Sequence, residues 1–161
     1  MVDALCNRYG LGQTYEILNM LHFSLKYYRK AALLRSFDAR IWCAIGGCYL
    51  SLGKRSESIR SYERAVSNND IEGVATEQLA KLYRDDGEFD KAAGCYQKLL
   101  SMHHSDDVDE RMAEALLFLA HYYKDAKNFD VASVCCSRLF EYPGPEKEEA
   151  KALLVRLTYF L

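Results

Sequence analysis

The chain has 161 residues, of which 50% are hydrophobic, 12% aromatic and 27% charged, and its formal net charge is −2. This composition supplies enough apolar material for a continuous core and excludes a disordered chain. The 21 basic residues are scattered among 23 acidic ones rather than gathered in a run, so the sequence gives no electrostatic reason to expect a nucleic-acid partner. No apolar run approaches the roughly 18 residues that a membrane span requires, and we expect no membrane partner.

Prolines and cysteines narrow the class of fold. The two prolines, Pro143 and Pro145, both lie near the C-terminus, so helix is permitted through most of the chain. The N-terminus lacks the pattern of a secretory signal. The cysteines lie inside apolar-periodic segments, and we expect them to be reduced, packed thiols of a cytosolic or nuclear protein. They are Cys6, Cys43, Cys48, Cys95, Cys135 and Cys136.

A pattern of small and aromatic residues returns along the chain at a fixed interval. Gly12, Gly46 and Ala80 are separated by 34 residues each, and Ala120 follows after a further 40. A 34-residue period with these residue types is the signature of the tetratricopeptide repeat (TPR), a helix–turn–helix unit that buries its faces by stacking on its neighbours. The sequence therefore predicts an all-α TPR solenoid of about four repeats with a C-terminal helix, as a single array over residues 1–161.

The first two predicted repeats cover residues 5–38 and 39–72, with approximate bounds. The second is the better match to the TPR pattern, because Arg8 stands in the first where a large aromatic residue is usual. Gly53 is expected to close the first helix of the second repeat in the left-handed conformation. The residues expected to pack the helices of these repeats together are Gly12, Tyr15, Tyr28, Ala31, Trp42, Gly46, Tyr49, Tyr62 and Ala65.

The third and fourth predicted repeats cover about residues 73–106 and 113–146, with an acidic loop between them. After the last repeat, residues 146–160 are predicted to form a helix with one apolar face. This helix either caps the array or begins a further repeat. The packing residues expected in this half of the chain are Ala80, Tyr83, Ala92, Tyr96, Ala120, Tyr123 and Ala132.

No motif in the sequence argues for catalysis. The stretch 47–55 resembles a phosphate-binding loop faintly, but its glycine spacing is one residue too long and Arg55 replaces the required Ser or Thr. His103 and His104 sit beside aspartates in one loop, which does not fix a metal geometry. The cysteine pairs lack the two-residue spacer of a zinc site. We expect a protein that is not an enzyme, with no catalytic residue, no cofactor and no metal.

A binding surface is the functional feature that the repeat pattern predicts. The first helix of each repeat lines the concave side of a TPR stack. Extending the repeat period along these first helices selects a set of residues that includes both acidic and basic side chains. Such a groove suits an extended peptide or a partner's helix. The alternative for each residue is an ordinary solvated helix face. The candidates are Tyr9, Gln13, Glu16, Arg40, Cys43, Glu77, Lys81, Arg84, His121 and Lys124.

Four stretches are more specific than the general TPR pattern: YGLGQTYEIL at 9–18, EGVATEQLAKLY at 72–83, EALLFLAHYYKDAKNFDVA at 114–132 and YPGPEKEEAKALL at 142–154. Together they resemble the C-terminal TPR region of the subunit 8 family of the anaphase-promoting complex, the cell-division-cycle-23-type proteins, in its plant-like form. Members of this family are longer, with further N-terminal repeats that include a homodimerisation region. The resemblance implies that this chain is a fragment or truncated form without that region.

The resemblance also implies a function. It points to a non-catalytic scaffold subunit of a ubiquitin ligase of the cell cycle, in the nucleus and cytoplasm. The implied partners are the other subunits of the complex and, through superhelix grooves, short motifs of activator proteins. Two alternatives stay open: a co-chaperone-type adaptor that grips an acidic C-terminal peptide, and a regulatory TPR segment of an enzyme whose catalytic domain is missing.

Overall fold

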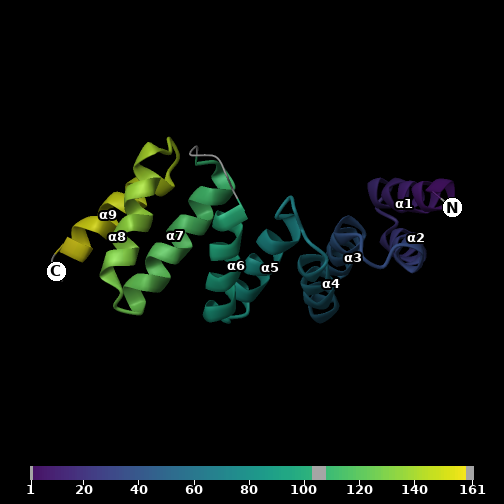
Figure 1. Cartoon of the computed structure of the whole chain (residues 1–161), viewed down its shortest axis with the longest axis horizontal. Helices are drawn as coiled ribbons and strands as arrows, with labels where there is room; N and C mark the ends of the chain where they lie inside the picture. The colour runs from purple at the N-terminus through teal and green to yellow at the C-terminus, as the bar shows by residue number, and fades with distance from the viewer. Residues whose placement is uncertain (1, 103–107, 159–161) are drawn as a thin grey trace. The chain divides into compact units, whose positions relative to one another are not determined.

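The computed structural model describes residues 2–102 and 108–158, and over these ranges it is built from helices joined by short turns (Figure 1). The prediction of an all-α chain is confirmed. The chain forms two compact units, Met1–Leu79 and Ala80–Leu161. Within the described ranges, no helix combines the length and the apolar character needed to cross a membrane.

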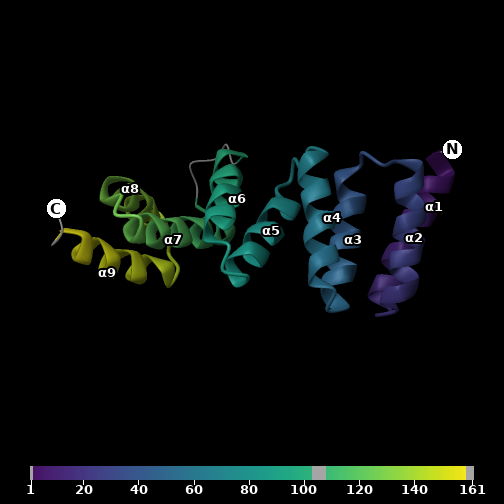
Figure 2. The ribbon, with the colours of Figure 1, turned by 90° about the horizontal axis from the view of Figure 1, so that it is seen from below.

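The first unit consists of two antiparallel helix pairs and the start of a fifth helix. The pairs are α1 (Val2–Ile17) with α2 (Leu21–Leu34), and α3 (Ala39–Ser51) with α4 (Arg55–Ser67). α3 packs against both α2 and α4, and Figure 2 shows α3 and α4 running side by side. A fifth helix, α5 (Val74–Asp85), begins in the first unit, and its residues from Ala80 onward belong to the second unit.

A close contact joins the two helices of the first pair. A Cβ atom at Gly12 would lie 2.5 Å from the ring of Tyr28, so the tyrosine ring occupies the space that a side chain on α1 would need. Ser24 lies in the same contact, and its Oγ donates a hydrogen bond to the Gly12 carbonyl at 2.8 Å. Both Ser24 and Tyr28 are buried. The missing side chain of Gly12 therefore sets how closely α1 and α2 approach each other.

The second pair repeats this contact one period later. A Cβ at Gly46 would lie 2.9 Å from the ring of Tyr62, and Ser58 Oγ donates to the Gly46 carbonyl at 2.9 Å. Ile41 and Ile45 are buried on the same helix and join the core that α2 and α3 share.

The turn inside each helix pair contains one residue with a left-handed backbone. These residues are Asn19 (φ 56°), Gly53 (φ 71°), Gly87 (φ 77°) and Lys127 (φ 60°). They occupy the same place in each repeat, and glycine or asparagine at three of them fits the preference of this conformation. The turn geometry is thus common to all four pairs.

The second unit contains α6 (Phe89–Met102), α7 (Glu110–Asp125), α8 (Phe129–Arg138), the short 3₁₀ helix η1 (Leu139–Glu141) and α9 (Glu146–Thr158). α7 packs against α6, α8 and α9. The core of this unit is a continuous cluster of alanine, leucine and cysteine side chains contributed by α5 to α9.

Alanine takes the place of glycine in the helix pairs of the second unit. Ala80 and Tyr96 are fully buried, as are Ala120 and its counterpart Cys136. The fourth pair therefore combines a larger residue on the first helix with a smaller one on the second.

Two element bounds differ from the sequence-based expectation. α7 begins at Glu110, ahead of the expected repeat start at residue 113, because the Asp109 carboxylate caps the helix by accepting from Met112 N at 2.8 Å. α8 ends at Arg138 and continues as η1, a feature that the repeat pattern does not predict. His103 and His104, which the sequence analysis considered and rejected as metal ligands, lie outside the described residues, as do residues 159 and 160 of the expected C-terminal helix.

The residues that the sequence selected for packing differ in their degree of burial. Five of them, all aromatic, are partly buried: Tyr15, Trp42, Tyr49, Tyr83 and Tyr123. The buried members are Gly12, Tyr28, Ala31, Gly46, Tyr62, Ala65, Ala80, Ala92, Tyr96, Ala120 and Ala132.

The glycine–tyrosine contact gives a stability prediction. Gly46→Trp is expected to destabilise the fold by about 1–3 kcal/mol or more, because overpacking forces the Tyr62 ring or the helix to move. Gly94→Trp is the matched control, since Gly94 is exposed on α6 and a Cβ there meets nothing within 4 Å. Thermal melts followed by circular dichroism measure both. Equal melting curves for Gly46→Trp and the parent chain would contradict the packing described here.

Candidate functional site

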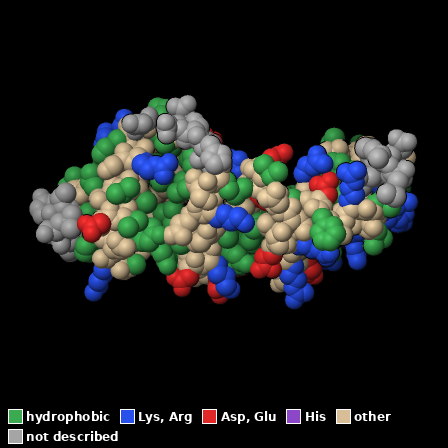
Figure 3. All heavy atoms as spheres, viewed as in Figure 1, with side chains coloured by type: hydrophobic (Ala, Val, Ile, Leu, Met, Phe, Trp, Pro, Cys, Tyr) green, Lys and Arg blue, Asp and Glu red, His purple; other side chains and the backbone are tan. Residues whose placement is uncertain are grey.

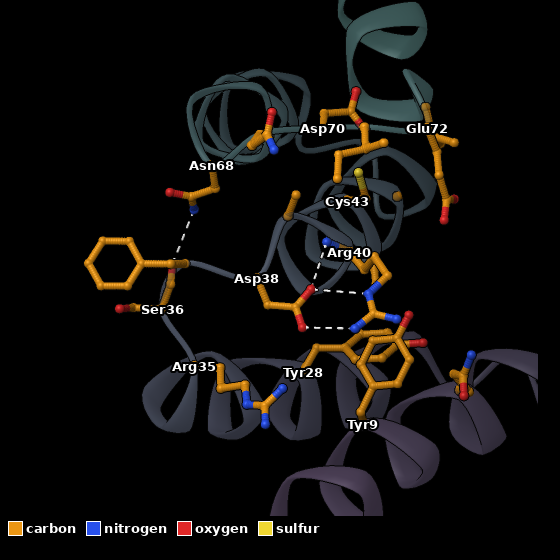
Figure 4. A pocket seen from close by; sticks show the side chains of 18 of the residues that line it. Tyr9, Tyr28, Arg35, Ser36, Asp38, Arg40, Cys43, Asn68, Asp70 and Glu72 are labelled. Carbon is orange, nitrogen blue, oxygen red and sulfur yellow. Dashed lines mark hydrogen bonds and ion pairs between the residues drawn. The ribbon is translucent and has the colours of Figure 1, made fainter.

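A groove of about 1160 Å³ opens in the first unit (Figure 4). It runs along α1 and α3 and is closed at one end by the loops that follow α2 and α4. Several predicted concave residues line it together: Tyr9, Gln13 and Glu16 from α1, and Arg40 and Cys43 from α3. The repeat pattern therefore brings these five residues, taken from two repeats, into one cavity.

Two tyrosine rings and a carboxylate form one wall of the groove. The ring centroids of Tyr9 and Tyr28 are 5.3 Å apart with a tilt of 47°. The Tyr28 hydroxyl donates to Glu16 Oε2 at 2.6 Å. Burial, followed by the bond to Glu16, raises the pKa of Tyr28, so this phenol keeps its proton and acts as the donor. The wall presents an aromatic surface with an oriented carboxylate beside it.

Arg40 stands on the opposite wall and is oriented by its neighbour. Its Nη2 lies 3.2 Å from Asp38 Oδ2, and its Nε donates to Asp38 Oδ1 at 3.3 Å. Asp38 also caps α3 by accepting from the Arg40 backbone N–H at 3.1 Å. The Arg40 side chain is 71% exposed against 15% for Asp38, so the guanidinium is held at one side and remains accessible on the other.

Hydrogen bonds fix the two loops at the end of the groove. Asp70, which is 6% exposed, accepts from Thr76 N at 2.8 Å and Thr76 Oγ1 at 3.0 Å. The Ser36 carbonyl accepts from Trp42 Nε1 at 2.8 Å and from Asn68 Nδ2 at 3.2 Å. The second of these bonds ties the loop after α2 to the end of α4.

The loops add an apolar rim that the sequence reasoning missed. Phe37 is 83% exposed and Ile71 78% exposed, and both line the groove. They are separated by the 34-residue period, so they occupy the same loop position in successive repeats. The recurrence of a large apolar residue at this position was the signal in the sequence that could have identified the rim. Among the residues that line the groove, acidic side chains outnumber basic ones: Glu16, Asp38, Asp70 and Glu72 against Arg35 and Arg40.

The groove can bind but shows no arrangement for bond chemistry among the described residues. Its parts are hydrogen-bond acceptors, one oriented guanidinium, an aromatic wall and an apolar rim. Such a set suits an extended polypeptide segment with side chains of alternating character.

The other predicted concave residues lie elsewhere. Glu77, on α5, does not line the groove. In the second unit, Lys81 Nζ lies 3.1 Å and Arg84 Nη1 2.7 Å from the Glu114 carboxylate, so α5 and α7 are joined by a charged cluster. Arg84 also donates to the Tyr96 hydroxyl at 3.3 Å. Sequence reasoning missed Glu114, because nothing in the repeat pattern marks the position as acidic.

The last two predicted concave residues are surface residues with partners nearby. His121 Nε2 lies 3.1 Å from Glu149 Oε1, and Lys124 Nζ lies 3.1 Å from Asp125 Oδ1. Both pairs are substantially exposed, and exposed pairs of this kind contribute little to stability.

Family models of the tetratricopeptide repeat match residues 39–70 and 75–110. Solved structures agree with this class. A tetratricopeptide repeat protein from Parabacteroides merdae superposes with a TM-score of 0.77 at 19% identity, covering 98% of this chain and 61% of its own. The TPR protein YrrB gives 0.73 at 17% identity, covering 95% and 75%. The chain therefore contains tetratricopeptide repeats over these residues and has the fold of TPR structures.

The sequence comparison is more specific. The chain is 46% identical over 99 residues to anaphase-promoting complex subunit 8 of Arabidopsis thaliana, a match that covers 61% of this chain and 17% of that protein. Subunit 8 of Dictyostelium discoideum is 47% identical over 99 residues, and this match also covers 61% of this chain and 17% of that protein. The resemblance of this TPR region to subunit 8 is thus confirmed, and the match spans about a sixth of these relatives.

The groove cysteine gives a reactivity prediction. Burial, with a further contribution from Asp70, raises the pKa of the Cys43 thiol to about 12. Because the thiolate is the nucleophile, iodoacetamide at about pH 8 is expected to label Cys43 at least about a hundredfold more slowly than glutathione. Peptide mapping by mass spectrometry measures the rate, and the chain unfolded in guanidinium is the control. Rapid labelling of Cys43 in the folded chain would show that its thiol is not held as described.

The charged cluster of the second unit gives a pH prediction. Burial disfavours ionised Glu114, but hydrogen bonds from Arg84 and Lys81 outweigh it and lower the pKa of this carboxyl. Its contribution to stability is therefore present above its ordinary pKa of 4.5 and is lost as the pH falls through the lowered value. We expect Glu114→Gln to reduce stability at neutral pH and to weaken its decline from about pH 6 to about pH 3.

The matched control is Glu88→Gln, which removes an exposed pair with Lys91 at 3.2 Å. This variant should keep the parent's acid sensitivity. Melting temperatures across the pH range measure both, and identical pH profiles for Glu114→Gln and the parent would contradict the role of this carboxylate.

Proposed function

We propose that the chain acts as a non-catalytic TPR scaffold of the anaphase-promoting complex, a ubiquitin ligase of the cell cycle, in the nucleus and cytoplasm. The observation that carries this proposal is the 46–47% identity to subunit 8 from two distant organisms. Identity at this level over 99 residues extends beyond the small set of positions that any TPR needs. The proposal rests on part of the length of those relatives.

In this role the groove of the first unit receives a segment of another subunit or of an activator protein. The acidic excess of its lining favours a segment with basic side chains, which Glu16 and Glu72 would meet. The apolar rim of Phe37 and Ile71 favours an aliphatic or aromatic side chain next to them. Arg40, oriented by Asp38, supplies donors for a backbone carbonyl or a carboxylate of the bound segment.

Affinity purification tests the assignment. The tagged chain, expressed in dividing Arabidopsis cells, is expected to copurify with other subunits of the anaphase-promoting complex. A variant with Glu16→Gln and Glu72→Gln keeps side-chain shape but removes two carboxylates from the groove, and we expect it to recover at least about fivefold less of a groove-bound partner. Quantitative mass spectrometry measures recovery.

The control variant, Glu88→Gln with Asp125→Asn, removes the same charge outside the groove and should leave recovery unchanged. If no ligase subunit copurifies with the parent chain, the scaffold assignment is wrong. If subunits copurify equally with both variants, the complex is reached through a surface other than the groove.

A further inference from the structure

The second helices of the first unit expose a face rich in lysine and arginine, which we call the basic face. It consists of Lys26, Arg29 and Lys30 on α2 and Arg60 and Arg64 on α4. Figure 3 shows basic side chains along the edge of the molecule formed by these helices. None of the five lines the groove. The basic residues are scattered in the sequence, and the fold collects them.

Helical and repeat periodicity together place these residues. On α2, the three cations occur at i, i+3 and i+4, which is one side of a helix, whereas Ser24 and Tyr28 are buried on the other. α2 contains no acidic residue. The 34-residue period then relates Lys26 to Arg60 and Lys30 to Arg64, so that the same positions are basic in both repeats.

Aromatic rings orient two of the cations. The guanidinium carbon of Arg64 lies 3.9 Å from the ring centroid of Trp42, and the ammonium of Lys30 lies 5.4 Å from that of Tyr27. A guanidinium stacked on a ring keeps its N–H donors free at its edges. The rings therefore order these side chains and leave their positive charge in place. A carboxylate partner would instead neutralise that charge.

The charges of the first unit are separated between two surfaces. Residues 1–79 contain ten Lys and Arg and eight Asp and Glu, and four of those acidic residues line the groove. On α4, Glu57 and Glu63 remain among the cations. In the second unit the positions that correspond to Lys26 and Arg60 are Gly94 and Val134, whereas those that correspond to Lys30 and Arg64 are Lys98 and Arg138. One row of cations therefore ends with the first unit, and only the first unit carries both rows.

We infer that the basic face docks an acidic segment of a partner polypeptide. Charge complementarity selects an acidic partner. Leu33, 85% exposed and on the same side of α2 as Lys26 and Lys30, supplies an apolar contact for a hydrophobic side chain of that segment. A nucleic acid fits less well, because a duplex carries one negative charge per about 1.7 Å of helix axis, whereas Glu57 and Glu63 interrupt the cations of α4. The inference does not depend on the proposed ligase role.

Fluorescence anisotropy tests this docking surface with the purified chain. The probe is a labelled peptide in which glutamates are interspersed with leucines, and its partner control carries glutamine in place of glutamate. Lys26→Glu with Arg60→Glu should weaken binding of the glutamate peptide at least about tenfold. The matched control, Lys98→Glu with Arg138→Glu, makes the same change of net charge on exposed helix positions of the second unit and should change affinity by less than about twofold.

A second variant separates a polypeptide partner from other polyanions. Leu33→Ser should weaken binding of the peptide, whereas Leu18→Ser, at another exposed leucine, should not. Equal losses in the two charge-reversal variants would mean that only net charge matters, and would overturn the inference. Tighter binding of a mixed-sequence DNA duplex, or of phosphatidylserine vesicles, than of the peptide would also overturn it. Circular dichroism verifies that each variant is folded.

Discussion

The structure depends on one contact inside each helix pair. A small residue on the first helix packs against the residue that follows it 16 positions later, on the second helix. Gly12 with Tyr28, and Gly46 with Tyr62, leave no space for a side chain between the helices. This contact sets the separation of each pair. The separation in turn determines where the next pair stacks, and thus where the groove walls of α1 and α3 stand.

Much of this arrangement could be predicted from the sequence, because the repeat period is a direct consequence of the packing. Gly12, Gly46 and Ala80 identify the pairs without any structure. The five groove residues from α1 and α3 were also within reach, since a helix position extrapolates from one repeat to the next. The loop residues Phe37 and Ile71 were not, because loops follow no helical periodicity and their contribution depends on how two repeats stack.

The contacts of the charged residues likewise depend on how helices stack, which the sequence does not reveal directly. Lys81 and Arg84 were expected on the concave face, but their relation to Glu114 depends on how α5 and α7 meet. The basic residues of α2 and α4 are dispersed in the sequence and come together through the helical repeat combined with the 34-residue period. A charge count over the chain averages an acidic groove and a basic outer face into a value near zero.

The tyrosine of the first and third pairs does more than fill the core. The ring of Tyr28 packs on Gly12, while its hydroxyl holds Glu16 in the groove, and the hydroxyl of Tyr96 likewise meets Arg84. One side chain thus links the spacing of the helices to the orientation of a surface charge 12 residues earlier. In evolutionary terms, a drift from tyrosine to phenylalanine would keep the architecture and release the charge, so recognition could diverge while the scaffold stayed intact.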